Sequence, residues 1–169
     1  MEFQLLVHRL QIFIMILRMP DIVIFDTSSL ILFDKINELS LFHQVYNKLL
    51  ITPEIAKEFG KKLPDWIEIQ TISDKKYQYF LETQLDQGEA SAIALATEFD
   101  DVLFILDDLK ARKLAERLRF RITGTLGVIH KAKQMSIIDE IKPLIDKLLE
   151  TDFRIADNIV KEILKLNNE

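Results

Sequence analysis

Two short apolar runs of this chain each end in acidic residues. Asp26 directly follows Ile22–Phe25, and Asp107 and Asp108 directly follow Val102–Leu106. Short, fully apolar runs of this kind are typical of buried parallel strands. In an open α/β sheet, ligands bind beyond the carboxyl ends of the strands, where the strand order reverses. If these two runs are neighbouring strands, their acids lie in one cleft.

Two further acids can reach the same cleft from helices. Glu58 lies near the end of the helix predicted over Pro53–Phe59, and Glu89 lies in the first turn of a helix that Gly88 opens. Each of these acids, taken alone, also has an ordinary role as a helix cap, a favourable charge at a helix N-terminus or a solvated surface group. Their joint placement favours a functional site.

The gathered carboxylates are suited to divalent metal ions. Mg²⁺ and Mn²⁺ are hard cations that take oxygen ligands, often a few carboxylates plus waters. Zinc prefers nitrogen and sulfur donors, but the chain has no cysteine, and His8, His43 and His130 form no spaced ligand set. A net charge of −5 suits carboxylates that a metal neutralises, and it disfavours a protein that coats DNA by charge alone.

Strands and helices alternate along the chain, which predicts an α/β fold with a central parallel sheet and right-handed crossovers. The predicted strands are Ile22–Phe25, Leu50–Thr52, Trp66–Thr71, Val102–Leu106 and Phe120–Ile122. The predicted helices are Leu30–Ile36, Leu39–Leu50, Pro53–Phe59, Lys75–Leu85, Gly88–Phe99, Leu109–Leu118 and Thr125–Lys133, followed by two near 139–149 and 155–166. The expected architecture is a three-layer α/β/α sandwich with additional C-terminal helices.

Composition agrees with one folded domain. The chain has 169 residues, of which 49% are hydrophobic, and this excludes intrinsic disorder. We expect the functional domain to start near Met19 and residues 1–19 to be an extension of uncertain role. The apolar run of this extension, Ile12–Leu17, is too short to span a bilayer. Residues 20–133 then form the α/β domain, and 134–169 form a helical pair packed on it. The absence of cysteine agrees with a reducing cytoplasm.

Four blocks of sequence carry a family resemblance. In order and spacing, VIFDTSSLILF, ITPEIAKEF, DQGEASAIALA and LFILDDLKARKLA resemble the PIN-domain nucleases. They look closest to stand-alone prokaryotic proteins related to the toxin halves of toxin–antitoxin pairs. The resemblance covers about residues 20–130, and the C-terminal tail resembles one PIN subgroup.

The resemblance implies a role for individual residues. The catalytic acids that it implies are Asp26, Glu58, Glu89 and Asp108, and the metal ligands are Asp26, Glu89, Asp107 and Asp108. Asp108 best matches the acid after the fourth strand, judged from the helix that follows, whereas Asp107 stands where many members carry Asn, Arg or Ala. Ser28 matches a small polar position and is expected to contact a ligand oxygen.

The function implied is hydrolysis of RNA by an endoribonuclease of toxin–antitoxin type. One or two Mg²⁺ or Mn²⁺ ions can activate water, neutralise the phosphate and stabilise the leaving oxygen. Lys110 and Arg112 are candidates for phosphate contacts, although a solvated helix face is the alternative for both. The family also implies a homodimer, an antitoxin partner and no membrane association. The rival interpretation is a PIN-like module that binds RNA or protein without cleaving it, which the presence of all four acids disfavours.

Overall fold

A five-stranded parallel sheet forms the centre of the computed structural model, which describes residues 19–169. Its strand order is β3-β2-β1-β4-β5, with β1 (Ile22–Phe25), β2 (Leu49–Ile51), β3 (Ile67–Ile69), β4 (Val102–Ile105) and β5 (Arg121–Thr123). The direction in which the strands are added reverses between β1 and β4. The predicted parallel sheet is confirmed. The proposed extension falls on residues 1–19, of which 1–18 lie outside the described residues.

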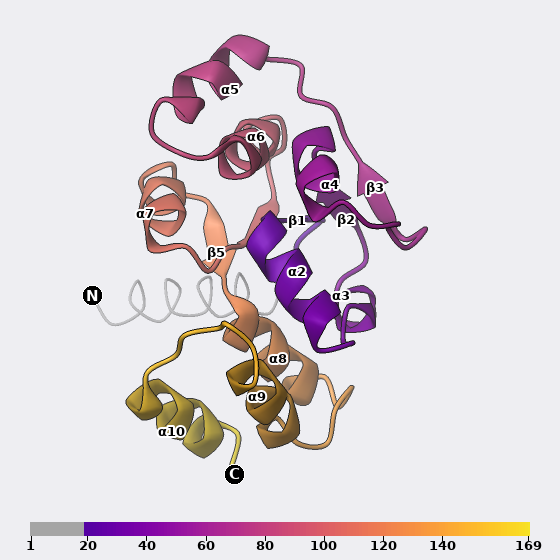
Figure 1. Ribbon diagram of the computed structural model, residues 1–169, viewed down its shortest axis with the longest axis vertical. Helices are drawn as coiled ribbons and strands as arrows, with labels where there is room; N and C mark the ends of the chain where they lie inside the picture. The colour runs from indigo at the N-terminus through magenta and orange to yellow at the C-terminus, as the bar shows by residue number, and fades with distance from the viewer. Residues whose placement is uncertain (1–18) are drawn as a thin grey trace, which may run out of the picture.

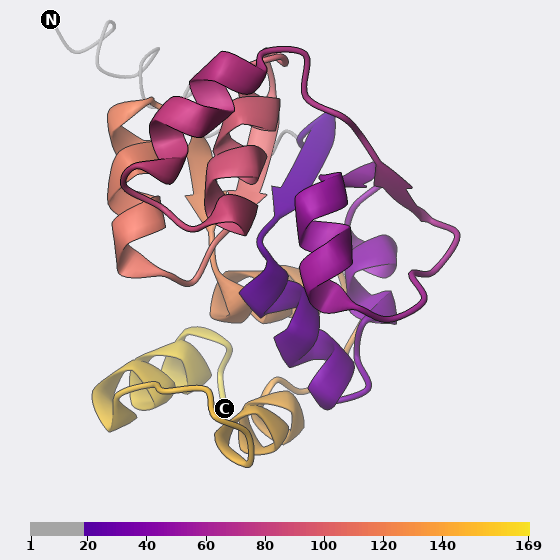
Figure 2. The same ribbon diagram turned by 45° about the horizontal axis from the view of Figure 1, so that its top comes forward.

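Helices cover both faces of the sheet, as Figures 1 and 2 show. On one side α4 packs against α6, and on the other α3 packs against α8. The helices are α2 (Thr27–Lys35), α3 (Ser40–Val45), α4 (Pro53–Phe59), α5 (Lys75–Glu82), α6 (Gln87–Ala96), α7 (Leu109–Arg117), α8 (Thr125–Gln134), α9 (Lys142–Leu149) and α10 (Asp157–Leu166). The expected three-layer sandwich with extra C-terminal helices is therefore present. No helix in residues 19–169 combines the length and apolar character needed to cross a membrane.

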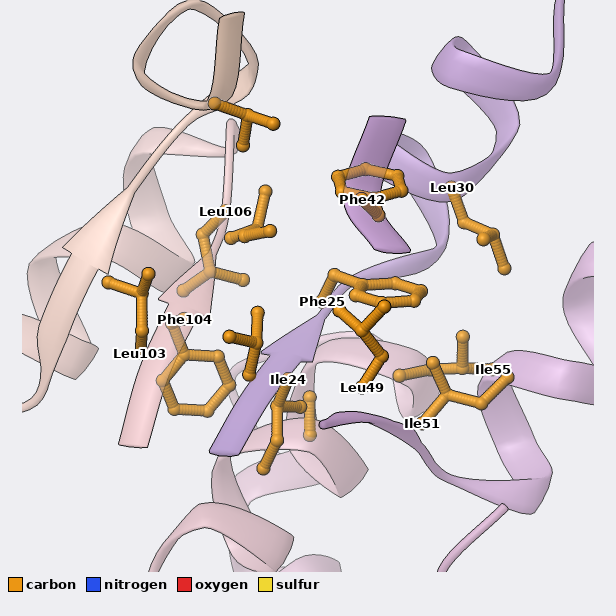
Figure 3. Close-up of a cluster of buried hydrophobic side chains, with 14 of the residues drawn as sticks. Ile24, Phe25, Leu30, Phe42, Leu49, Ile51, Ile55, Leu103, Phe104 and Leu106 are labelled. Carbon is orange, nitrogen blue, oxygen red and sulfur yellow. The ribbon is translucent and has the colours of Figure 1, made fainter. Parts of the chain in front are cut away.

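The two central strands are apolar because both of their faces are covered. Every residue of β1 and β4 is buried, and the parallel register pairs Phe25 with Ile105. Phe25 stacks on Phe42 of α3 with ring centroids 5.0 Å apart, within the cluster drawn in Figure 3. This register places the residues that follow β1 and β4 side by side at the carboxyl edge of the sheet.

The predicted helix over Leu39–Leu50 is wrong in its second half. Helix α3 ends at Val45, and the chain then enters β2, where Leu49 pairs with Val23 of β1. The backbone amide of Val23 also donates to the carbonyl of Lys48, 2.9 Å away. Helical periodicity was a poor guide here because residues buried on both faces of a sheet show no period of their own.

The C-terminal helices are joined to the domain unequally. Helix α9 buries Leu144, Ile145 and Leu148, whereas no residue of α10 is buried. Glu169, which follows α10, contacts the start of α9: its carboxylate accepts from the backbone amide of Ile141 at 2.9 and 3.1 Å. Figures 1 and 2 place α9 and α10 at the opposite end of the molecule from α5.

Candidate active site

The first turn of α2 is the centre of the acidic site. Asp26 follows β1 and caps α2, with its Oδ1 accepting from the backbone amide of Ser29 at 2.8 Å. Its Oδ2 accepts from the hydroxyl of Ser28 at 2.7 Å. Asp26 is only 2% exposed. Burial raises the pKa of its carboxyl, the hydrogen bonds from Ser29 and Ser28 oppose this rise, and the negative charge of Asp107 adds to it.

Glu58 reaches the same turn from α4. Its Oε2 accepts a hydrogen bond of 2.7 Å from the hydroxyl of Thr27, the residue next to Asp26. Gly88, in the first turn of α6, faces both side chains. A Cβ atom at Gly88 would lie 2.8 Å from Glu58 Oε2 and 3.0 Å from Thr27 Oγ1, so a side chain there would push the two apart. Gly88 thus leaves space for the Glu58 side chain at the start of α6.

Asp107 joins the cluster from β4. The hydroxyl of Ser29 donates to its Oδ2 at 3.3 Å, so Ser29 contacts both Asp26 and Asp107. On its other side, Thr125 donates to Asp107 from its backbone amide at 3.0 Å and from its hydroxyl at 2.5 Å. The N-terminus of α8 therefore binds an anion, and that anion is a carboxylate of this chain. A Cβ atom at Gly124 would lie 2.6 Å from Asp107 Oδ1, so this position also needs glycine for space.

Asp108 has different surroundings from its neighbour. It caps α7, with Oδ1 accepting from the backbone amides of Lys110 at 2.8 Å and Ala111 at 2.9 Å. It is exposed, whereas Asp107 is half-buried. Its negative charge contributes to raising the pKa of the Glu89 carboxyl. The two adjacent acids thus serve opposite sides of the site.

Glu89 lies in the first turn of α6, in surroundings that disfavour its charged form. Burial raises the pKa of the half-buried Glu89 to about 7, and the negative charges of Asp86 and Asp108 contribute in the same direction. Asp26 adds a smaller contribution. Asp86 lies close because it caps α6, accepting from the backbone amide of Glu89 at 2.8 Å. Electrostatically, Glu89 therefore connects the Asp26 side of the cluster with the Asp108 side.

The donor chemistry fits a hard divalent cation. In the described part of the chain, no three acids form a group that could hold an ion with the side chains as they stand. The predicted ligands Asp26, Glu89, Asp107 and Asp108 nevertheless offer carboxylate oxygen alone, which is the donor that Mg²⁺ and Mn²⁺ prefer. Two of them, Asp26 and Glu89, carry raised pKa values in part because other carboxylates are near. A cation at this place would relieve that repulsion.

The predicted phosphate contacts flank the acids differently. Lys110 is exposed in the first turn of α7, beside Asp108. Arg112 is half-buried, and its Nη1 donates to the carbonyl of Leu106 at 2.8 Å. A Cβ atom at Gly124 would lie 3.1 Å from Arg112 Nη1, which places this guanidinium beside the Asp107 side of the cluster. Ser28 is exposed next to Asp26.

Sequence reasoning missed the groups that hold the acids. The hydroxyls of Thr27, Ser28 and Ser29 each donate to a different carboxylate, but only Ser28 was singled out from the sequence. Thr125 and Asp86 were missed as well. A usable signal was present, because three consecutive hydroxyl residues directly after a strand-end acid exceed what one helix cap requires.

The comparison with known proteins gives one match. A PIN domain family model (DUF3368) matches residues 22–169, a range that includes the sheet, all the acids above and the C-terminal helices. No curated protein and no solved structure matches the chain. The sheet order, the acids at its central switch point and this match over most of the sequence agree, and the chain belongs to the PIN-domain family.

Proposed function

We propose that this protein is an Mg²⁺- or Mn²⁺-dependent endoribonuclease. The observation that carries the proposal is the first turn of α2, where three consecutive hydroxyls donate to the carboxylates of Glu58, Asp26 and Asp107. These acids come from three different elements and meet at the switch point between β1 and β4. A helix needs one cap, so a turn that arranges several like charges indicates a ligand of opposite charge.

A metal ion would be held by Asp26, Glu89, Asp107 and Asp108. When bound, it supplies an activated water and neutralises the charge of a phosphodiester. The chain's own groups fix the ligands: Ser29 contacts two of them, and Thr125 fixes Asp107 from the far side. Such outer contacts set ligand orientation and commonly matter to metal affinity almost as much as the ligands.

Glu89 and Glu58 are the candidates for proton transfer. Without a metal ion the pKa of the Glu89 carboxyl is raised to about 7, so near neutral pH this group takes up a proton that it releases when a cation binds. Glu58 is exposed and is oriented by Thr27, which leaves it open to solvent and to a substrate. Lys110 and Arg112 lie around these acids and supply donors for the phosphate of an RNA strand. The hydroxyl of Ser28 donates to Asp26, and its oxygen can still accept from a bound water.

The toxin–antitoxin assignment belongs to this proposal and rests on the sequence resemblance. It carries with it a homodimer, an antitoxin partner and a cytoplasmic location. The alternative is a PIN-like module that binds RNA or protein without cleaving it. The elaborate arrangement of the acids favours the enzyme, because a binding surface for RNA gains nothing from gathered negative charge.

The proposal is tested by incubating the purified full chain with mixed RNA and Mn²⁺, with and without EDTA. We expect cleavage that EDTA stops and that Asp26→Asn removes. The matched control is Asp65→Asn, which removes one exposed acid outside the cluster and should leave cleavage intact. Cleavage that continues in EDTA and in Asp26→Asn would come from a contaminant and would overturn the proposal. A co-crystal with Mn²⁺ would show directly which of the carboxylates of Asp26, Glu89, Asp107 and Asp108 contact the ion.

A further inference from the structure

A cavity of about 290 Å³ adjoins the acids without being part of the proposed reaction. Helix α2 lines one side with Ile31 and Leu32, both between one and two turns beyond Asp26. The connection between α9 and α10 lines the other side with Phe153, which is partly buried against the core. The cavity is therefore formed between the catalytic domain and the C-terminal helices.

One end of the cavity is shared with the acidic site. Ser28 and Asp107 both line it, and both belong to the acid cluster described above. A molecule that occupied the cavity would therefore touch the place where a substrate phosphate must lie. The opposite rim carries a cation, Lys35, whose ammonium lies 2.9 Å from the exposed carboxylate of Asp152.

We propose that this cavity binds one base of the RNA strand, next to the phosphate that is cleaved. The inference rests on the proposed function and names a base-binding subsite for it. An apolar cavity with an aromatic side chain in its wall is the usual environment for an unstacked RNA base. Its volume is at the lower limit of small-molecule sites, which suits a single planar ring system rather than a folded peptide.

The charges at the two ends agree with a nucleotide as the occupant. The base enters the apolar part, its own phosphate lies toward Ser28 and the acids, and the next phosphate lies near Lys35. Both partners of the Lys35–Asp152 pair are largely exposed, so the pair is weak and Lys35 can exchange Asp152 for a phosphate. An apolar side chain of a protein partner would use the cavity but not Lys35, and the experiment separates these two occupants.

The experiment measures RNA binding and cleavage separately. Binding of a short single-stranded RNA to the full chain is followed by fluorescence anisotropy in EDTA, where no cleavage occurs. Because stacking of a base on an aromatic ring is lost, Phe153→Leu should raise Kd about tenfold. In cleavage assays with Mn²⁺ it should raise KM by a similar factor and leave kcat unchanged. Phe153→Trp, which keeps a stacking surface, should bind at least as well as the wild type.

A matched control removes an exposed ring elsewhere. Phe80 is 61% exposed on α5, and Figures 1 and 2 place this helix at the opposite end of the molecule from α9 and α10, so Phe80→Leu should leave Kd and KM unchanged. An abasic nucleotide in the RNA, combined with Phe153→Leu in the protein, makes a double-mutant cycle. An abasic nucleotide moved along the strand should weaken binding about tenfold at one position, and Phe153→Leu should then add no further loss.

Each outcome counts for or against the subsite. If Phe153→Leu and Phe153→Trp both bind RNA like the wild type, or if the abasic and Phe153→Leu losses add fully, the cavity does not hold a base. If the wild-type protein does not bind the RNA at all, the cavity does not hold a base either, and a protein partner is left as its occupant. Binding that follows the expected pattern without any cleavage overturns the nuclease and leaves the base subsite standing. Cleavage with unchanged KM in Phe153→Leu overturns only the subsite.

Discussion

The two carboxyl-rich regions of this protein use their acids in opposite ways. Around the first turn of α2, carboxylates face one another, and burial together with nearby negative charge raises the pKa of Glu89 to about 7. At the C-terminal helices, Glu169 instead faces the amides of Ile141 and Lys142 and the ammonium of Lys133. These contacts hold its pKa below the ordinary value, against a desolvation effect that opposes them. One arrangement opposes folding and the other supports it.

The opposite pKa shifts of Glu89 and Glu169 indicate which of the two regions is the better candidate for a functional site. A group of like charges in a buried turn costs stability, and such a cost is expected at a functional site that a ligand completes. The C-terminal helices have no such cost, and they differ in burial: α9 buries Leu144, Ile145 and Leu148, whereas the apolar residues of α10 are at most partly buried. We therefore expect α10 and the connection before it to open more readily than the acidic site, which follows two fully buried strands.

The largest effect should come from removing a central carboxylate charge. Asp107→Asn keeps the side-chain shape but loses a negative charge beside Asp26, so we expect cleavage activity to fall by more than about 100-fold, since even outer-shell changes cost 10–100-fold. The metal-free protein should not lose stability, because charge repulsion is relieved. Activity assays and thermal unfolding in EDTA check both parts. A variant that keeps activity would remove Asp107 from the metal ligands and leave Asp108 in that role.

The next effect should come from a residue that holds an acid without being one. Thr125→Val removes the hydroxyl that donates to Asp107 at 2.5 Å, so the carboxylate loses part of its orientation. We expect about a 10–100-fold loss of activity together with weaker Mn²⁺ binding, measured by calorimetry. Thr125→Ser, which restores the hydroxyl, should recover both.

A control separates this positioning role from a simple loss of a hydrogen bond. Thr97 donates its hydroxyl to the carbonyl of Ala94 at 2.7 Å, at the end of α6 and outside the acid cluster. Thr97→Val should leave Mn²⁺ affinity and activity unchanged. Equal effects of Thr97→Val and Thr125→Val would show that Thr125 acts on stability alone.

The sequence predicted where the acids are but not what holds them. The β1 strand was predicted with its observed ends, and the acids after β1 and β4 could be placed at one edge because parallel strands align their carboxyl ends. The hydroxyl contacts of Thr27 and Ser29 depend on how closely α4 and the β4–α7 connection approach α2. That approach is a tertiary property, which no local pattern records.

The different surroundings of Asp107 and Asp108 are also a tertiary property that the sequence does not record. In sequence, Asp108 was favoured as the ligand because a helix follows it, and in the structure that helix uses Asp108 as its cap. Asp107 is the residue that contacts Ser29 and Thr125, a fact that depends on α8 returning to the end of β4. Helix caps and metal ligands favour the same residue types at strand ends, so their sequence signals overlap.

A smaller effect should appear in the pH dependence of metal-free stability. Because the pKa of Glu89 rises from 4.5 to about 7 on folding, the folded state binds more protons between these values. The contribution of Glu89 to the free energy of unfolding is therefore fully present below its unfolded pKa, and it is lost as the pH rises through about 7. Glu89→Gln should therefore be more stable than the wild type above about pH 7, by roughly 1 kcal/mol after allowance for solvent screening.

Urea unfolding in EDTA at about pH 5 and about pH 8 measures this difference. Mn²⁺ should restore the wild type at high pH, adding roughly 2.7 kcal/mol at a hundred times its dissociation constant. Glu116→Gln, an exposed change on α7, should keep the wild-type pH dependence. If Glu89→Gln keeps the wild-type pH dependence of stability too, Glu89 is not the carboxyl whose charged form is disfavoured by folding.

The smallest effect should have the opposite sign and lie in the C-terminal helices. Glu169 has a lowered pKa because it accepts from the backbone amides of Ile141 and Lys142, so its contribution is present above its unfolded pKa and is lost as the pH falls. Glu169→Gln should weaken α9 by less than about 1 kcal/mol near neutral pH, where a charged cap matters, and by nothing in acid. Hydrogen exchange of the α9 amides at about pH 7 should reveal this local loss, while the amides of β1 and β4, which carry Asp26 and Asp107, remain protected. If the strand amides exchange faster to the same extent, the two regions unfold as one unit, and the C-terminal helices open no more readily than the acidic site.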